Sequence, residues 1–169
     1  MLLAEALAAR KDAITQIDDL RGRLTSAALR YEDQERAGDD PADVVARLGA
    51  TLDRFESLTV RINRTNNATR LTFDERDLSL MEAIALRERL VLEAKARRGA
   101  VEAVEAATGA GGTSRSRGWL GTRRTKDDVR EVPTVDLAAE RRAADQLSEA
   151  VRRLDLALQQ RNWTTELRE

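Results

Sequence analysis

The sequence predicts an all-α protein: an antiparallel four-helix bundle of long helices, with a Gly/Arg-rich loop or short hairpin between the third and fourth helices. Hydrophobic residues make up 41% of the chain and aromatic residues only 3%, so Leu, Ile, Val and Ala must form the core. Apolar residues recur at steps of three and four, and the breaks in this pattern fall at prolines and glycines. We therefore expect one domain over residues 1–169, with helices at about 2–36, 41–66, 79–108 and 136–162.

The first expected helix, residues 2–36, carries a single apolar stripe. The residues of this stripe are Leu3, Leu7, Ile14, Ile17, Leu24, Ala28 and Tyr31. Gly38 follows, and Asp40 and Pro41 then have the order of an N-cap and a first helical residue. Proline is favoured at the first helical position because the N–H that it lacks would have no partner inside the helix there. A second helix is therefore expected to begin at residue 41.

The second and third expected helices are also amphipathic. The apolar residues of the second, 41–66, are Val45, Leu48, Leu52, Phe55, Leu58 and Ile62. Ser79 and Glu82 have the spacing of a capping box, and Leu78 stands where a hydrophobic staple begins. These three residues predict the start of the third helix at residue 79.

The segment 109–135 has no helical period. Five of the nine glycines fall between Gly109 and Gly121, which favours a loop or hairpin. Apolar residues alternate from Val129 to Val135 and predict a short strand. Pro133 and Asp136 then introduce the last helix, 136–162.

Composition excludes several classes of function. The chain has no His and no Cys, so it has no histidine base, thiolate nucleophile or disulfide. Its 29 basic and 30 acidic residues give a formal charge of -1, which removes any global attraction to nucleic acid. The first residues lack the basic region of a signal peptide and no long uncharged apolar run follows, so we expect a soluble cytoplasmic protein. We expect no cofactor, no metal and no catalytic residue.

A polar run at the end of the second helix is the first candidate site. The apolar stripe, extended past Ile62 at the same spacing, reaches Asn66 and Thr69. Polar side chains are therefore expected on the helix face that carries Leu and Ile residues earlier in the helix. One reading is a pocket floor that binds a small polar ligand or a partner's backbone. The other is a helix C-terminus, with Asn in the left-handed cap and a polar layer that fixes register. The candidate residues are Asn63, Thr65, Asn66, Asn67 and Thr69, joined in an antiparallel bundle by Asn162 and Trp163.

A basic loop is the second candidate site. Residues 113–126 contain five positive charges and no acid. Arginines beside an exposed Trp could bind nucleic acid or an anionic surface, or could pair with acidic helix faces while the Trp packs on the bundle. The candidate residues are Arg115, Arg117, Trp119, Arg123, Arg124 and Lys126.

The run Ile62-Asn63-Arg64-Thr65-Asn66-Asn67-Ala68-Thr69, with Leu154-Asp155 and Gln160-Arg161-Asn162-Trp163, resembles the small bacterial helical family known as septicolysin. The resemblance covers essentially the whole chain and implies an all-α bundle of uncharacterised function. Relatives have a Tyr-containing segment before the last helix, whereas this chain has Arg115-Ser116-Arg117-Gly118-Trp119 there. The chain also lacks a secretion signal and membrane-length β-hairpins, so pore formation is not carried over.

A slender bundle has little interior per residue, which favours association with another copy. The function expected from the sequence is therefore that of a non-enzymatic helical interaction or assembly protein that forms homo-oligomers. The alternative is a nucleic-acid or anionic-surface binding protein that acts through residues 113–126.

Overall fold

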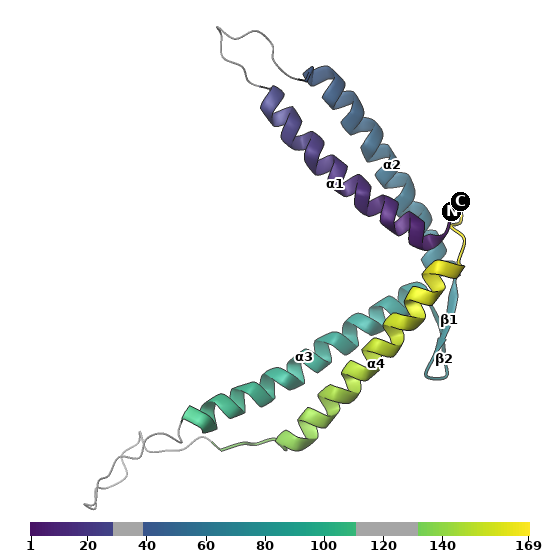
Figure 1. Cartoon of the computed structure of the whole chain (residues 1–169). Coiled ribbons are helices and arrows are strands. Elements are labelled where there is room, and N and C mark those ends of the chain that lie inside the picture. Colours follow the sequence, from purple (N-terminus) through teal and green to yellow (C-terminus); the bar gives the residue numbers. More distant parts are fainter. Residues whose placement is uncertain (29–38, 111–131) are drawn as a thin grey trace, which may run out of the picture. The chain divides into compact units, whose positions relative to one another are not determined.

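The computed structural model describes residues 1–28, 39–110 and 132–169, and it is mainly helical (Figure 1). Its four helices and two strands follow one another in the order α1, α2, β1, β2, α3 and α4. Their bounds are α1 Leu3–Ala27, α2 Pro41–Ala68, β1 Arg70–Phe73, β2 Arg76–Ser79, α3 Leu80–Ala110 and α4 Leu137–Thr164. The all-α class is thus confirmed in broad terms, with a small antiparallel sheet added to it.

Local capping signals set the helix starts. The carboxylate of Asp40 accepts a 3.1 Å hydrogen bond from the N–H of Ala42 at the start of α2. At the start of α3, the backbone N–H of Ser79 donates to Glu82 at 2.6 Å and the N–H of Glu82 donates to the Ser79 hydroxyl at 3.2 Å. The predicted capping box is confirmed, and it satisfies donors that have no partner inside the helix.

The hairpin of β1 and β2 was not predicted. Its strands pair with Leu71 opposite Leu78 and Phe73 opposite Arg76, which leaves a two-residue turn at Asp74 and Glu75. Both turn residues have positive φ, 45° and 62°, as a type I′ hairpin turn requires. Leu71, Phe73 and Leu78 are buried, so one face of the hairpin belongs to the core.

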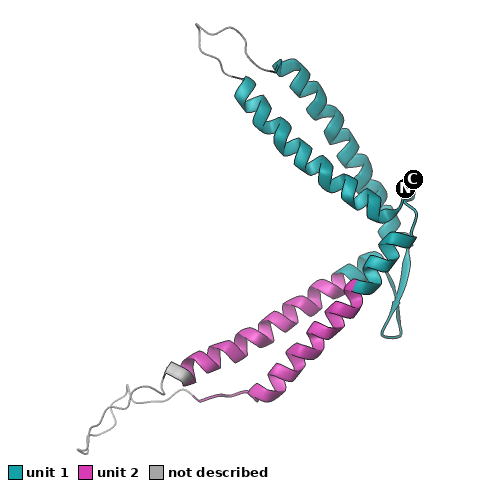
Figure 2. Ribbon diagram, viewed as in Figure 1, with its two compact units in different colours: residues 1–84, 156–169 teal, residues 85–155 magenta. Residues whose placement is uncertain are grey.

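The chain contains two compact units, which Figure 2 shows in teal and magenta. Unit 1 comprises residues 1–84 and 156–169, and unit 2 comprises residues 85–155. In unit 1, α1 and α2 run antiparallel and side by side (Figure 1). Between them lie small and medium-sized apolar side chains: Leu3, Ala6, Ala13, Leu20, Val44, Leu58 and Ile62.

Unit 2 consists mainly of α3 and α4 and has a thin core. Its buried apolar residues are Leu90, Ala94, Val101, Ala144 and Leu154. Polar contacts join the two helices along their length: Arg87 with Asp155, Arg97 with Glu140, Arg98 with Ser148, and Arg141 with Glu105. Polar contacts between the two helices thus accompany a small apolar core in unit 2.

Two local expectations are corrected. Residues 132–135 form no strand, and the rest of the predicted strand, 129–131, lies outside the described residues. Helix α2 does not end in a left-handed Asn cap, because its C-cap is Thr69 with extended backbone (φ -90°, ψ 129°). The chain passes from this extended residue directly into β1, which explains why no left-handed turn is needed.

Candidate functional site

The polar run of α2 divides into buried and exposed residues. Thr65 and Asn66 are buried, Thr69 is half-buried, and Asn63 and Asn67 are exposed. The Thr65 hydroxyl donates a 2.8 Å hydrogen bond to the carbonyl of Arg61 and accepts one of 2.9 Å from the N–H of Arg168. Both hydrogen-bonding capacities of this hydroxyl are used inside the chain, so Thr65 has a structural role.

The segment after α4 connects the ends of α1 and α2. The N–H of Leu3 donates to the carbonyl of Thr165 at 2.8 Å, and the N–H of Leu167 donates to the carbonyl of Met1 at 2.9 Å. Arg61 donates through Nε to the carbonyl of Arg168 at 3.2 Å. These contacts satisfy the first backbone donors of α1 and hold this segment against α2.

Asn66 differs from Thr65 in its contacts. Its residue surface is only 8% exposed, yet its side-chain amide makes no hydrogen bond within the part of the chain that the structure describes. It lies one helical turn after the buried Ile62, at the end of the same line of residues. Asn66 is therefore the member of the predicted layer that has hydrogen-bonding capacity left.

The end of α4 reaches β1 through Arg161, which was not among the candidate site residues. Arg161 donates through Nε to the carbonyl of Arg70 at 3.0 Å. Asn162 is half-buried, whereas Trp163 is 63% exposed and so does not cover the core. Arginines near helix ends are common on helical surfaces. The sequence alone therefore did not indicate that Arg161 contacts β1.

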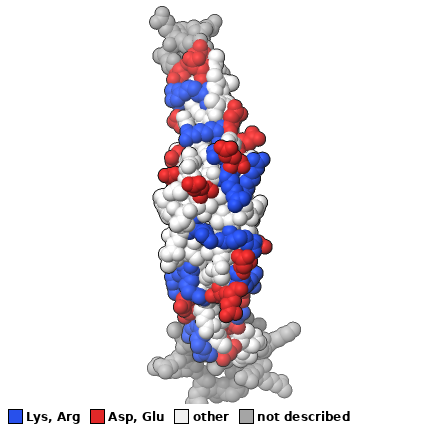
Figure 3. Space-filling view, turned by 90° about the vertical axis from the view of Figure 1, so that its right-hand side faces the viewer, with Lys and Arg blue, Asp and Glu red and all other residues white. Residues whose placement is uncertain are grey.

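The basic loop lies outside the described residues. This holds for all its candidates: Arg115, Arg117, Trp119, Arg123, Arg124 and Lys126. On the face shown in Figure 3, the described basic and acidic side chains are interspersed. No group of three or more acidic residues suited to a metal ion occurs among the described residues, and none of the described helices is long and apolar enough to cross a membrane.

An apolar strip runs along one face of the α1/α2 pair. On α1, Leu7 and Ile14 each follow a buried alanine by one position, and on α2, Val45 and Leu52 each follow a buried residue by one position. Because the helices are antiparallel, these two flanks lie on the same face of the pair. The apolar strip comprises Leu7, Ile14, Val45, Leu48, Leu52 and Phe55, all of them half-buried or exposed.

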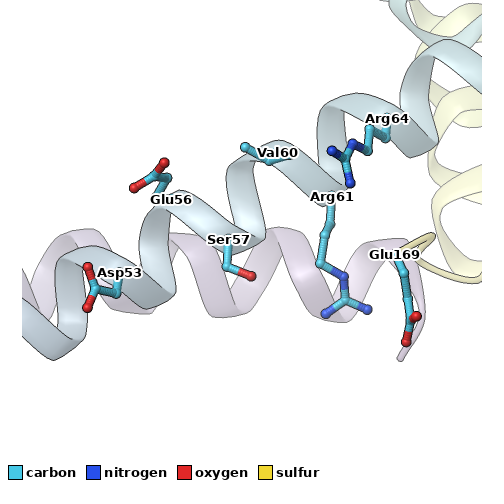
Figure 4. A pocket seen from close by; sticks show the side chains of 7 residues that line it. All are labelled: Asp53, Glu56, Ser57, Val60, Arg61, Arg64 and Glu169. Atoms are coloured by element: carbon cyan, nitrogen blue, oxygen red, sulfur yellow. The ribbon is translucent and has the colours of Figure 1, made fainter.

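The other side of α2 has a shallow groove of about 530 Å³ (Figure 4). It is lined by Asp53, Glu56, Ser57, Val60, Arg61, Arg64 and Glu169. The two acidic residues from α2 lie toward one end, and the two arginines lie with Glu169 toward the other. The groove therefore has an acidic end and an arginine end, and the arginine end also holds the carboxylate of Glu169.

Hydrogen bonds lower the pKa of two carboxyl groups elsewhere in unit 1. Hydrogen bonds from the backbone and hydroxyl of Ser79 hold the pKa of Glu82 below its ordinary value. Arg23 donates two 2.6 Å hydrogen bonds to Asp39 and lowers the pKa of that carboxyl. Both carboxylates are fixed in the ionised form by contacts at helix ends, which indicates a structural role.

The fold and these surfaces define an all-helical protein with a small hairpin whose candidate sites are helix faces. The chain belongs to a family of unknown function, DUF6847, whose model matches residues 10–167. It is similar to a functionally unknown conserved protein from Corynebacterium diphtheriae, known from its crystal structure, with 28% sequence identity, a TM-score of 0.81 and 99% of each chain covered. No curated protein matches the chain.

Proposed function

We propose that this protein is a non-enzymatic helical assembly protein that forms homo-oligomers through the apolar strip of α1 and α2. The observation that carries the proposal is the exposure of that strip. Val45 is 53% exposed, and Ile14 and Leu52 are each 44% exposed. Contiguous exposed apolar residues on a helix pair are typical of a surface that another element covers.

The energetic argument follows from the construction of a helix pair. Two helices bury one seam, and the residues beside that seam stay partly in water until a second layer packs on them. Covering a half-exposed Leu, Ile or Val contributes about 1 kcal/mol. The strip contains three such residues, Ile14, Val45 and Leu52, and three less exposed apolar residues beside them, which supports association despite the loss of freedom on binding.

A second copy is the occupant we propose for the strip. The α1/α2 pairs of two copies then form a four-helix bundle between chains, packed as in a coiled coil, which differs from the bundle of one chain's four helices expected from the sequence. Asn66 lies on α2 beyond the strip, is 8% exposed, and makes no side-chain hydrogen bond among the described residues. A polar residue at one position of a helical interface selects a single register, which is the role proposed for the Asn/Thr layer.

The test is the mass of the full chain in solution, measured by size-exclusion chromatography with light scattering. We expect a defined multiple of 18.8 kDa for the unmodified chain and a smaller multiple for Leu52→Glu. Leu92→Glu is the matched control, because Leu92 is exposed on α3 outside the strip. An unchanged mass for Leu52→Glu contradicts the proposal.

The same experiment addresses the alternative function. Absorbance at 260 nm that falls in high salt would favour nucleic-acid binding through residues 113–126 over assembly alone. The likeness to the septicolysin family stays a prediction, and we propose no cytolytic activity.

A further inference from the structure

The outward side of α2 carries a second seam of residues, separate from the apolar strip. Seven residues follow one another at alternating steps of four and three, and all seven are exposed: Ala46, Ala50, Asp53, Ser57, Val60, Arg64 and Asn67. This spacing is that of a helix interface in a coiled coil. The seam lies on the opposite side of α2 from Thr51 and Leu58, which face α1.

The charges along this seam are separated by sign. Asp53 and Glu56 come first, three residues apart, and Arg61 and Arg64 follow at the same spacing (Figure 4). Like charges three residues apart are neighbours on a helix and repel each other. Such an arrangement is unfavourable in an isolated helix, and a partner of opposite pattern would relieve it.

These side chains are not neutralised within the chain. Asp53, Glu56 and Arg64 make no hydrogen bond or ion pair within residues 1–28, 39–110 and 132–169. Arg61 donates through Nε to the carbonyl of Arg168, and no carboxylate pairs with its guanidinium in the described part of the chain. Glu169 lies at the basic end but forms no ion pair with either arginine there.

We propose that the α2 seam is a self-complementary interface at which two copies of this chain pair antiparallel. A two-fold axis between Ser57 and Val60 places Asp53 of one copy opposite Arg64 of the other. The same axis places Ala50 opposite Asn67, whereas Glu56 and Arg61 lie on the two opposite flanks of the contact. Each contact occurs twice, as in any isologous dimer.

The pattern identifies a second copy as the partner. When two α2 helices pair antiparallel, the acidic half of each helix meets the basic half of the other. In a parallel pair like charges would meet, so the seam is complementary to itself only in the antiparallel orientation. Ala46, Ala50 and Ser57 are small, which allows two helices to approach to about 8–10 Å. At the centre, the exposed Val60 meets Ser57 of the other copy.

This inference extends the proposed function, because it rests on self-assembly but uses a different surface. Two separate isologous contacts on one chain close into a tetramer when their two-fold axes intersect at right angles. Axes that intersect at 60° or another simple fraction of 180° give a larger closed assembly, and axes that do not intersect give an open chain. Disrupting one contact leaves the other intact. The two surfaces can therefore be tested independently.

The experiment compares Arg64→Glu, Asp53→Arg and the double variant Asp53→Arg/Arg64→Glu in the full chain, by light scattering and sedimentation velocity. Each single variant places two like-charged pairs across the contact, so we expect the dissociation constant to rise about tenfold or more. The double variant restores opposite charges in the reversed sense and should recover the original mass. Arg54→Glu, on α2 outside the seam, is the charge-matched control and should leave the mass unchanged. Circular dichroism checks that each variant keeps its helices.

The outcomes separate the two proposals. If Leu52→Glu lowers the mass and Arg64→Glu does not, the seam proposal is wrong and the apolar-strip proposal stands. If Arg64→Glu lowers the mass and Leu52→Glu does not, the seam proposal stands and the strip proposal is wrong. A double variant that stays dissociated like the single variants would overturn the antiparallel pairing.

Discussion

The backbone N–H of Arg168 donates a 2.9 Å hydrogen bond to the buried hydroxyl of Thr65, 103 residues earlier in the chain. This bond joins the segment after α4 to the last turn of α2. Because Thr65 also donates to the carbonyl of Arg61, a single side chain links two backbone segments. Contacts of this kind make the ends of three helices depend on one another.

Replacing Thr65 tests this link. Thr65→Val keeps the shape of the side chain but removes the hydroxyl and leaves the N–H of Arg168 without its acceptor, so we expect a loss of about 1–2 kcal/mol in the free energy of unfolding. Thr65→Ser keeps the hydroxyl and should lose less. Urea denaturation of the two variants measures the difference, and equal losses would show that volume rather than hydrogen bonding matters here.

Stability should depend on pH through Glu82. The pKa of Glu82 is lowered in the folded protein, so the stability that it contributes is fully present above its ordinary pKa and is lost as the pH falls through the lowered value. Glu82→Gln keeps an acceptor in the capping box but cannot titrate. Denaturation curves from neutral to acidic pH should therefore fall less steeply for this variant. Parallel curves for the two proteins would rule out a contribution from Glu82.

The ion pairs of unit 2 predict a dependence on salt. Arg87 pairs with Asp155, and each side chain is more than a third exposed, so solvent screens the pair strongly. Asp155→Asn should cost less than about 1 kcal/mol in low salt, and less again in high salt. A double-mutant cycle with Arg87→Met isolates the pair energy. A coupling energy that is the same at both salt concentrations would contradict an electrostatic origin.

Core truncation should show which apolar residues stabilise the fold and which serve association. Leu20 is fully buried between α1 and α2, so Leu20→Ala should lower the free energy of unfolding by about 2–5 kcal/mol. Ile14→Ala, in the apolar strip, should cost far less in a dissociated chain. Its effect should appear instead in the concentration at which the protein associates, measured by sedimentation. A large loss of stability for dissociated Ile14→Ala would place Ile14 in the monomer core.

Local signals explain what could be predicted from the sequence. Asp40 before Pro41, and Ser79 three residues before Glu82, are short-range patterns whose chemistry acts within one helical turn, and both caps form in the structure. The hairpin was missed because its strands have four residues each and its turn residues, Asp74 and Glu75, lack the Gly that usually marks a type I′ turn.

Long-range contacts could not be predicted in the same way. The bonds from Arg168 to Thr65 and from Arg161 to Arg70 depend on where the chain returns after α4, which no local pattern indicates. The exposure of Trp163 could not be predicted for the same reason, because a Trp near a helix end covers the core only when another element lies beneath it. The grouping of Asn63, Thr65, Asn66 and Asn67 was visible in the sequence. The sequence did not indicate which of these side chains is hydrogen-bonded inside the chain: the Thr65 hydroxyl makes two such bonds and the Asn66 amide makes none among the described residues.

Ser79 is both the last residue of β2 and the N-cap of α3, so no loop separates the strand from the helix. One inserted residue after Ser79 would move Glu82 out of reach of its capping partner. It would also turn every following side chain of α3 by about 100° relative to the hairpin. The hairpin thus fixes the direction of the first buried side chains of α3, Leu80 and Ala83, and natural insertions and deletions should be absent at this junction.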